Sequence, residues 1–355
     1  MSRRSATLIE VARLAGVSTA TVNRVLKQRG YISEEAREKV LAAVEATQYR
    51  PNVLAQGLRT RRSQTIGLML TAITVNPFFV GVAHAVELAA VSAGYRTVMF
   101  NHGGSAEQER IGIENFIAQR VDAVLFCTAV HPDNLALLER AGIPAIEIER
   151  SSTATASCVR VDNYVGARAA IDHLVGLGHR AIAFVGGDTA LYPRDAARNR
   201  SVEEDRLAAY RDGMAAHDLS TNEDWIRLGT YYDLDGSNTG KEGRDHAEAL
   251  MALAEPPTAI FATCDILAAG VLHALYRAGK RVPHDISVVG FDDTLASYLS
   301  PELTTVAQPL SMLGAQAFHM ALEAIESAKT QHEIVLPSTL VIRHSTGPAP
   351  AAATV

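Results

Sequence analysis

Seven short apolar runs recur between residues 66 and 291, and they constrain the fold more than any other feature of the sequence. Each run is apolar almost throughout, which is typical of strands covered on both faces in a parallel sheet. Helical segments separate the runs, so the pattern predicts doubly wound α/β units. Because these strands are too many for one compact sheet, we expect two lobes that divide near Val161 and Asp162. The runs are 66–70, 96–100, 122–126, 144–148, 181–185, 258–262 and 286–291.

The composition is that of an ordinary soluble globular protein. The chain has 355 residues, of which 48% are apolar and 20% charged, enough for two or three compact units. Its first ten residues lack the apolar stretch of a signal peptide, and no window is apolar enough to span a membrane. The widely spaced Cys127, Cys158 and Cys264 suit a reducing compartment and exclude a disulfide framework or a cysteine zinc site. We therefore expect a cytoplasmic protein.

Residues 7–29 predict two short capped helices on either side of a glycine turn. Thr7 and Glu10 have the spacing of a capping box, Gly16 can adopt the angles of a sharp turn, and Ser18 is placed to cap the second helix. A third helix follows from the cap Ser33. The predicted apolar faces consist of Leu8, Val11, Ala12, Ala15, Val22, Val25, Leu26, Ala36, Val40, Leu41 and Val44. Two helices across a tight turn are typical of a helix-turn-helix.

Charge is distributed unevenly along the chain. Residues 1–63 carry twelve Lys and Arg against five Asp and Glu, a net of +7, whereas the remainder has a net of −13 and the whole chain −6. A basic head on an acidic body indicates a phosphate-binding module joined to a separate sensing module. The alternative is that the three helices form an all-α cap with no role in DNA binding.

Two stretches, VARLAGVSTATVNRVL and YRPNVLAQGL, are similar to the lac repressor family of bacterial transcription regulators, and the resemblance continues to the end of the folded chain. It implies an α/β fold with a three-helix head and a two-lobed, periplasmic-binding-protein-like body, in which the chain recrosses near Asp292 and Ala328. The expected parts are a DNA-binding head over 1–50, a hinge helix or linker over 51–62, an effector-binding and dimerisation domain over 63–342 with lobes 63–161 plus 292–327 and 162–291 plus 328–342, and a disordered tail over 343–355.

The resemblance also implies a DNA-reading face. The second head helix would enter the major groove, where the small Thr19 and Ala20 favour thymine methyl groups and Arg24 meets a phosphate or guanine. The hinge would order on DNA and insert Leu58 into the minor groove, although Gly57 disfavours the helix; the alternative is a flexible basic linker. The implied DNA-binding residues are Thr7, Ser18, Thr19, Ala20, Thr21, Asn23, Arg24, Asn52, Ala55 and Leu58.

Polar residues of both charge signs follow the apolar runs. Ligands of open α/β sheets bind at the carboxyl ends of the strands, so two facing lobes would enclose a cleft for a hydroxylated or charged small molecule. The resemblance implies that Asn76 contacts a sugar hydroxyl and that phenylalanine covers the ring face. The expected effector-binding residues are Asn76, Phe78, Phe79, Asn101, Thr128, Glu149, Arg150, Arg206, Cys264, Asp265, Asp292 and Gln308.

Two departures from the family pattern bear on the effector. Cys264 stands where the family usually has asparagine, so a hydroxyl contact is lost and the effector need not be a standard hexose or pentose. The segment 187–206 is longer than usual and rich in Arg and Asp. It is either a mobile flap over the cleft or an exposed excursion without a ligand role.

The expected site residues also have structural interpretations. Phe78 and Phe79 could be core residues at the start of a helix, Asp292 could cap the segment that follows it, and Arg206 could be a solvated helix residue. Cys264 is more often a small buried hydrophobe than a reactive thiol.

The pattern as a whole predicts a ligand-controlled transcription repressor. It would bind a pseudo-palindromic operator as a homodimer, with a sugar or sugar-like effector in the cleft and no membrane partner. No cofactor, metal or catalytic residue is expected, because the DxDG sequence from Asp233 lacks the glycine and glutamate of a calcium loop and no GxGxxG follows the first strand. The alternatives are a solute-binding protein, which the basic head disfavours, and a sugar-processing α/β enzyme with a helical cap, for which a nucleophile-base motif is missing.

Overall fold

The protein is described by a computed structural model that covers residues 6–26, 31–49, 62–71, 76–129, 131–152, 157–191, 194–196, 198–231, 240–327 and 332–350. The chain forms two compact units, Met1–Ser63 and Gln64–Val355. Within the described ranges, no helix is long and apolar enough to cross a membrane.

The described part of the first unit contains the helices α1 (Leu8–Ala15), α2 (Thr19–Leu26) and α3 (Glu34–Thr47). The capping box of α1 is confirmed, because the Thr7 amide donates to Glu10 Oε2 at 2.7 Å and the Glu10 amide donates to Thr7 Oγ1 at 3.3 Å. Gly16 ends α1 at a φ of 66°, and Ser18 Oγ accepts the Thr21 amide at 3.1 Å to start α2. The predicted helix-turn-helix is present.

A small apolar core joins the three helices, and its buried members are Val11, Ala12, Ala15, Val22, Val25, Val40 and Ala43. The prediction that Leu41 belongs to this core was wrong, since its side chain is 50% exposed. On α3 the inward face repeats at residues three and four apart, so Val40, Ala43 and Val44 share it. Leu41 follows Val40 by one residue and is therefore turned by about 100° away from the core.

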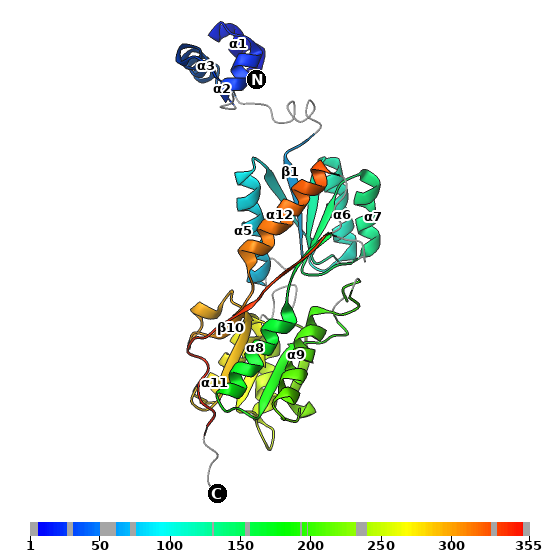
Figure 1. Ribbon diagram of the computed structural model, residues 1–355, viewed down its shortest axis with the longest axis vertical. Helices are drawn as coiled ribbons and strands as arrows, with labels where there is room; N and C mark the ends of the chain where they lie inside the picture. The colour runs from blue at the N-terminus through cyan, green and yellow to red at the C-terminus, as the bar shows by residue number, and fades with distance from the viewer. Residues whose placement is uncertain are drawn as a thin grey trace. The chain divides into compact units, whose positions relative to one another are not determined.

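Two six-stranded sheets form the second unit, and each is the centre of one lobe (Figure 1). The first lobe has the strand order β11-β5-β4-β3-β1-β2 and the second the order β12-β10-β9-β8-β6-β7. All neighbouring strands are parallel except β10 and β12. The strands of the first sheet are β1 (Thr65–Leu70), β2 (Arg96–Asn101), β3 (Ala123–Cys127), β4 (Ala145–Ile148), β5 (Ser157–Val161) and β11 (Glu333–Leu336). Those of the second are β6 (Ile182–Gly187), β7 (Ile226–Gly229), β8 (Ala259–Ala262), β9 (Ser287–Asp292), β10 (Thr304–Ala307) and β12 (Thr339–Val341).

Helices cover both faces of each sheet, as Figure 1 shows for α5 and α6 in the first lobe. The first lobe contains α5 (Pro77–Ser92), α6 (Ala106–Ala118), α7 (Pro132–Ala141) and α12 (Leu310–Glu326). The second contains α8 (Asn163–Gly176), α9 (Val202–Ala216), α10 (Lys241–Met251), α11 (Asp265–Arg277) and the short 3-10 helices η1 (Glu223–Trp225) and η2 (Ala296–Tyr298). Apolar cores lie on both faces of each sheet, so the doubly wound α/β architecture is confirmed.

The seven apolar runs all form strands, but one of them is not buried as predicted. The strand β2 lies at the edge of its sheet, and Met99 is 56% exposed. Five further strands, β5, β7, β10, β11 and β12, were not predicted. They are short or mixed in polarity, so they lack the continuous apolar signal of buried parallel strands.

The chain crosses between the lobes later than predicted. The expected crossing near Asp292 was wrong, because β10 pairs with β9 and belongs to the second sheet, so the chain leaves that lobe after Ala307. The expected return near Ala328 was also wrong, because β11 pairs with β5 and the chain returns after Leu336. The polar sequence of β10 explains why the crossing was placed too early. Its Thr304 and Thr305 are buried, but threonines do not give the apolar pattern that predicts a core strand.

The end of the chain is more ordered than predicted over its described part. The expected disordered tail 343–355 is bonded to the second lobe up to about residue 349. The Val288 amide donates to the Ser345 carbonyl at 2.9 Å, Ser345 Oγ donates to the Val288 carbonyl at 2.6 Å, and the Ala349 amide donates to the Leu177 carbonyl at 2.9 Å. These bonds satisfy polar groups that would otherwise be buried unpaired beside β9.

Candidate functional site

The head presents one polar face of α2. Ser18, Thr19, Ala20 and Arg24 are exposed, and Thr21 and Asn23 are half-buried, whereas Val22 and Val25 face the core. Thr7, at the start of α1, is exposed and its hydroxyl is used in the capping box. The described part of the predicted DNA-reading set therefore lies at the surface. Asn52, Ala55 and Leu58, together with Gly57, lie outside the described residues.

A cavity of about 500 Å³ lies between the carboxyl ends of the two sheets. Ten of the twelve predicted effector-binding residues line it: Asn76, Phe78, Phe79, Thr128, Glu149, Arg150, Arg206, Cys264, Asp292 and Gln308. It is also lined by residues outside that set of twelve: Thr71, Gly104, Ala129, Leu191, Val202, Glu203, Thr230 and Tyr231. Because both lobes contribute residues to this lining, a bound molecule could contact both lobes at once.

Arg206 is held rigidly at the wall of the cavity. Its Nε and Nη2 donate to Asn163 Oδ1 at 3.0 and 2.8 Å, and its Nη1 donates to the Thr263 carbonyl at 2.7 Å. The guanidinium carbon lies 3.9 Å from the centre of the Phe291 ring, a cation–π contact. Asn163 also links Arg206 to Glu149, because its Nδ2 donates to Glu149 Oε1 at 2.8 Å. The interpretation of Arg206 as a solvated helix residue is therefore wrong, since it is 5% exposed.

Two buried carboxyl groups face the cavity. Burial raises the pKa of Asp292 to about 8, against the opposing charge of Arg206. Burial likewise raises the pKa of Glu149, although the Asn163 hydrogen bond and the Arg206 charge act in the opposite direction. A carboxyl group with a raised pKa can donate or accept a hydrogen bond, which suits a hydroxyl group of a ligand.

Some acceptors at this wall are left for a ligand. Asp292 Oδ1 accepts Gln308 Nε2 at 2.7 Å, whereas Gln308 Oε1 and Glu149 Oε2 are buried without a hydrogen-bond partner among the described residues. Buried polar atoms are normally paired, so these two acceptors fit a molecule that donates hydrogen bonds. Such an arrangement is typical of a site that recognises hydroxyl or amino groups.

Three residues at the cavity have strained backbones. Thr128, Glu149 and Asp292 have φ angles of 70°, 73° and 112°, all in a region that residues with a Cβ rarely adopt. Each stands at or directly after the carboxyl end of a parallel strand. Strain of this kind, which costs about 1–3 kcal/mol for each residue, is concentrated at functional sites.

An ion pair joins the two lobes at the cavity. Arg150, which follows β4 in the first lobe, donates from Nη2 to Glu203 Oε1 at 2.7 Å and from Nη1 to Glu203 Oε2 at 3.0 Å. Burial acts to raise the pKa of Glu203, but the charge and hydrogen bonds of Arg150 outweigh it and the pKa is lowered. Glu203 was not predicted as a site residue, yet it lies three positions before Arg206 on α9, a spacing that puts both on one helix face.

Two phenylalanines line the cavity and also belong to the apolar core of the first lobe. Phe78 and Phe79 are each 6% exposed, and their rings meet edge to face with centroids 5.3 Å apart. Both belong to the apolar core of the first lobe while they also line the cavity. Asn76 caps α5, because its Oδ1 accepts the Phe78 amide at 3.0 Å. Because Oδ1 is used in this cap, a contact of Asn76 with a ligand would fall to its amide nitrogen.

Two predicted site residues do not line the cavity. Asp265 is fully buried, and its carboxylate accepts the Thr294 and Leu295 amides at 2.7 and 3.0 Å and Thr305 Oγ1 at 2.8 Å. It braces the connection after β9 and faces away from the ligand space. Asn101 is exposed at the end of the edge strand β2, outside the cavity lining.

Cys264 does line the cavity, but as a small buried side chain. It is 3% exposed, and burial raises the pKa of its thiol. A thiol in this state is a poor nucleophile, which agrees with its interpretation as a small hydrophobe.

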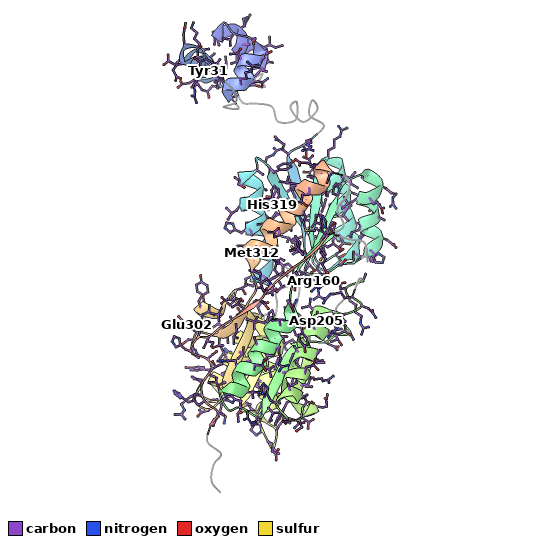
Figure 2. All side chains as sticks on the ribbon, in the orientation of Figure 1. Tyr31, Arg160, Asp205, Glu302, Met312 and His319 are labelled. Carbon is purple, nitrogen blue, oxygen red and sulfur yellow. The ribbon has the colours of Figure 1, made fainter. Side chains whose placement is uncertain are left out.

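The described part of the long loop before α9 connects the two lobes. Asp195 Oδ2 accepts the Ser151 amide at 3.2 Å, and the Ala196 amide donates to the Ser151 carbonyl at 2.8 Å. Arg198 donates from Nη1 to Asp205 at 2.8 Å, which ties the loop to α9; Asp205 is labelled in Figure 2. Leu191 from this loop lines the cavity. Over its described part the loop is therefore bonded to both lobes, and whether it has a ligand role stays a prediction.

Comparisons with known proteins agree with these observations. Residues 7–52 match the family described as bacterial regulatory proteins, lacI family, and residues 171–346 match a periplasmic binding protein-like domain. The transcriptional repressor PurR of Photobacterium profundum is 33% identical over 345 residues, which cover 96% of this chain and 98% of the relative. The chain belongs to the lacI family. It is a ligand-responsive DNA-binding regulator, and the solute-binding and enzymatic alternatives are not favoured.

Solved structures of lacI-family proteins share the same architecture. The lac repressor dimer bound to operator and the anti-inducer ONPF has 28% identity and a TM-score of 0.79, covering 97% of this chain and 100% of that chain. A lacI-family regulator from Enterococcus faecium with bound ribose has 27% identity and a TM-score of 0.68, covering 80% of this chain and 99% of that chain.

Proposed function

We propose that this protein is a transcription repressor that binds a pseudo-palindromic operator as a homodimer and responds to a small hydroxylated molecule in the cavity between its lobes. One observation carries the proposal: both lobes contribute hydrogen-bonding side chains to the same cavity, in a chain that also has a helix-turn-helix head. A ligand that contacts both lobes stabilises one angle between them. Differential affinity for two lobe arrangements is what a ligand needs to shift an equilibrium.

The polar face of α2 supports the DNA part of the proposal. Thr19 and Ala20 are exposed and small, so the backbone of α2 can approach thymine methyl groups closely in a major groove. Arg24, one turn further along, is placed for a phosphate or a guanine. The similar lac repressor structure contains operator DNA, which is the partner proposed here.

Exposed apolar side chains on the first lobe support a homodimer. Val80, Leu88 and Val91 on α5 are 49%, 59% and 64% exposed, and Met312 on α12, labelled in Figure 2, is 51% exposed. The helices α5 and α12 pack against each other. Exposed apolar side chains that gather on two packed helices favour a protein–protein contact. The similar lac repressor is a dimer in its operator complex.

The cavity lining supports a neutral or weakly polar ligand with several donors. The acceptors Glu149 Oε2 and Gln308 Oε1 face donors of the ligand, while Phe78 and Phe79 offer apolar surface for a ring. A similar regulator holds ribose. We propose a sugar or a related polyhydroxy compound as the effector, with Cys264 leaving one polar contact fewer than an asparagine would give.

A ligand screen followed by an operator-binding assay tests the proposal. Thermal unfolding of the full-length protein with sugars, polyols and nucleosides should identify a compound that raises the melting temperature, since a ligand at about 100 times its Kd adds about 2.7 kcal/mol. That compound should change the affinity for operator DNA selected from a random pool. A protein that selects no DNA sequence from the pool would contradict the proposed function.

A further inference from the structure

The charge that a ligand can carry depends on which cations of the cavity are available. Arg150 and Arg206 are the arginines of the described cavity lining. A phosphate or carboxylate on a ligand would need one of them, because guanidinium groups bind such anions through two parallel hydrogen bonds.

Arg150 is already engaged in that way by Glu203. Both oxygens of Glu203 accept from the two terminal nitrogens of Arg150, at 2.7 and 3.0 Å, and the Glu203 side chain is fully buried. This is the two-pronged geometry that an anionic ligand would adopt. An incoming anion must displace the Glu203 carboxylate or bind elsewhere. Glu203 cannot diffuse away, because it is part of the same chain.

The position of Glu203 on α9 keeps its carboxylate charged and fixed. The helix begins at Val202 and is capped by Ser201, whose Oγ accepts the Glu204 amide at 3.1 Å while the Glu204 carboxylate accepts the Ser201 amide at 2.7 Å. Glu203 therefore lies in the first turn of a capped helix, where the helix dipole stabilises a negative charge. The carboxylate both occupies Arg150 and repels any other anion nearby.

Only part of the Arg206 guanidinium is left for an anion. Three of its N–H groups donate to Asn163 and the Thr263 carbonyl, and one face of its guanidinium is covered by Phe291. The carboxyl groups of Glu149 and Asp292 line the same cavity. An anionic ligand would thus meet two carboxyl groups besides Glu203, whereas a hydroxylated neutral ligand can exchange hydrogen bonds with both of them.

We propose that Glu203 is a specificity-determining residue, which makes the cavity select an uncharged polyhydroxy ligand and reject its phosphorylated or carboxylated counterpart. Selectivity arises because an anion must break the ion pair, whereas a neutral ligand leaves the pair intact. The inference rests on the proposed function only in taking this cavity as the effector site.

The test compares anion binding by the wild-type protein and by the Glu203→Gln variant. Calorimetric titration of the full-length protein with inorganic phosphate and with D-ribose 5-phosphate should show no binding to the wild type. Glutamine keeps the shape of Glu203 but removes the charge that pairs with Arg150, so Glu203→Gln should bind both anions with a Kd at least about tenfold below the highest anion concentration at which the wild type shows no binding. The double variant Arg150→Gln/Glu203→Gln should lose that gain, which locates the anion at Arg150.

Glu248→Gln is the matched control, because it removes the same charge from an exposed position on α10. It should behave as the wild type. A Glu203→Gln protein that is folded by circular dichroism yet gains no anion affinity overturns the proposal. If that variant does not fold, the titration of the wild type still tests the proposal. Binding of D-ribose 5-phosphate to the wild-type cavity would also overturn it. Neither result bears on operator binding, whose absence would instead contradict the proposed function.

Discussion

The contact between Asp195 and Ser151 should control how often the cavity opens. Asp195 is 2% exposed, and its Oδ2 accepts the Ser151 amide across the two lobes at 3.2 Å. Hydrogen bonds to charged groups contribute about 1.5–3 kcal/mol. The Asp195→Ala change removes this bond, together with the bond from the Arg198 amide to Asp195 Oδ1 within the loop, but keeps the backbone bond from Ala196 to Ser151. The open arrangement should therefore become roughly 10 to 150 times more populated.

Thiol labelling of Cys264 measures this opening without a known ligand. Cys264 lines the cavity and is 3% exposed, so a thiol reagent should reach it faster when the lobes separate. Where closing is faster than labelling, the labelling rate follows the open population. A Cys264→Ser background identifies labelling of the other two thiols, Cys127 and Cys158, which are also buried.

The expected result is a labelling rate of Cys264 that rises roughly 10-fold to 150-fold in Asp195→Ala. Asp224→Ala is the control, since it makes the same substitution at an exposed position of the second lobe. An unchanged rate in a folded Asp195→Ala protein would refute the idea that this contact holds the lobes together.

Three further predictions concern the head, the cavity and the core. Arg24→Ala should weaken operator binding and reduce the slope of log affinity against log salt by about one, and an unchanged salt titration would rule out a phosphate contact at this residue. Because burial raises the pKa of Asp292 to about 8, the stability it contributes is complete below about pH 4 and is lost as the pH rises to about 8; Asp292→Asn should flatten this part of the stability curve in thermal unfolding. A Cβ on Gly243 would lie 2.1 Å from the Leu267 carbonyl oxygen, so Gly243→Ala should lower the free energy of unfolding in urea by about 1–3 kcal/mol, whereas Gly176→Ala, which meets open space, should not.

Local chemistry made the head predictable from its sequence. The capping box of Thr7 and Glu10, the turn at Gly16 and the cap at Ser18 depend on residues only a few positions apart. Leu41 shows the limit of such reasoning, because an apolar residue one step from the inward face of α3 looks like a core residue when only its type is considered.

The cavity residues that directly follow a predicted strand could be identified from the sequence. Thr128, Glu149 and Asp292 follow apolar strands, and parallel strands bring their carboxyl ends to one edge. Asp265 also follows a strand, but its side chain turns into the protein to accept two backbone amides, which its sequence position does not reveal.

Contacts between distant segments could not be predicted. Glu203 pairs with Arg150 across 53 positions and two lobes, so its local sequence, rich in acidic residues, suggested a solvated helix start. The crossings after Ala307 and Leu336 depend on short strands whose pairing partners are set by the tertiary fold.

A molecule bound in the cavity should change the affinity of the protein for operator DNA. Fluorescence anisotropy of the selected operator, measured with and without the compound from the thermal screen, tests this coupling most directly. We expect a change in operator affinity of about 5-fold to 150-fold in the wild type, and none in a folded Asp292→Asn/Arg206→Gln protein that no longer binds the compound. A compound that binds the cavity tightly and leaves the operator affinity unchanged would contradict the coupling.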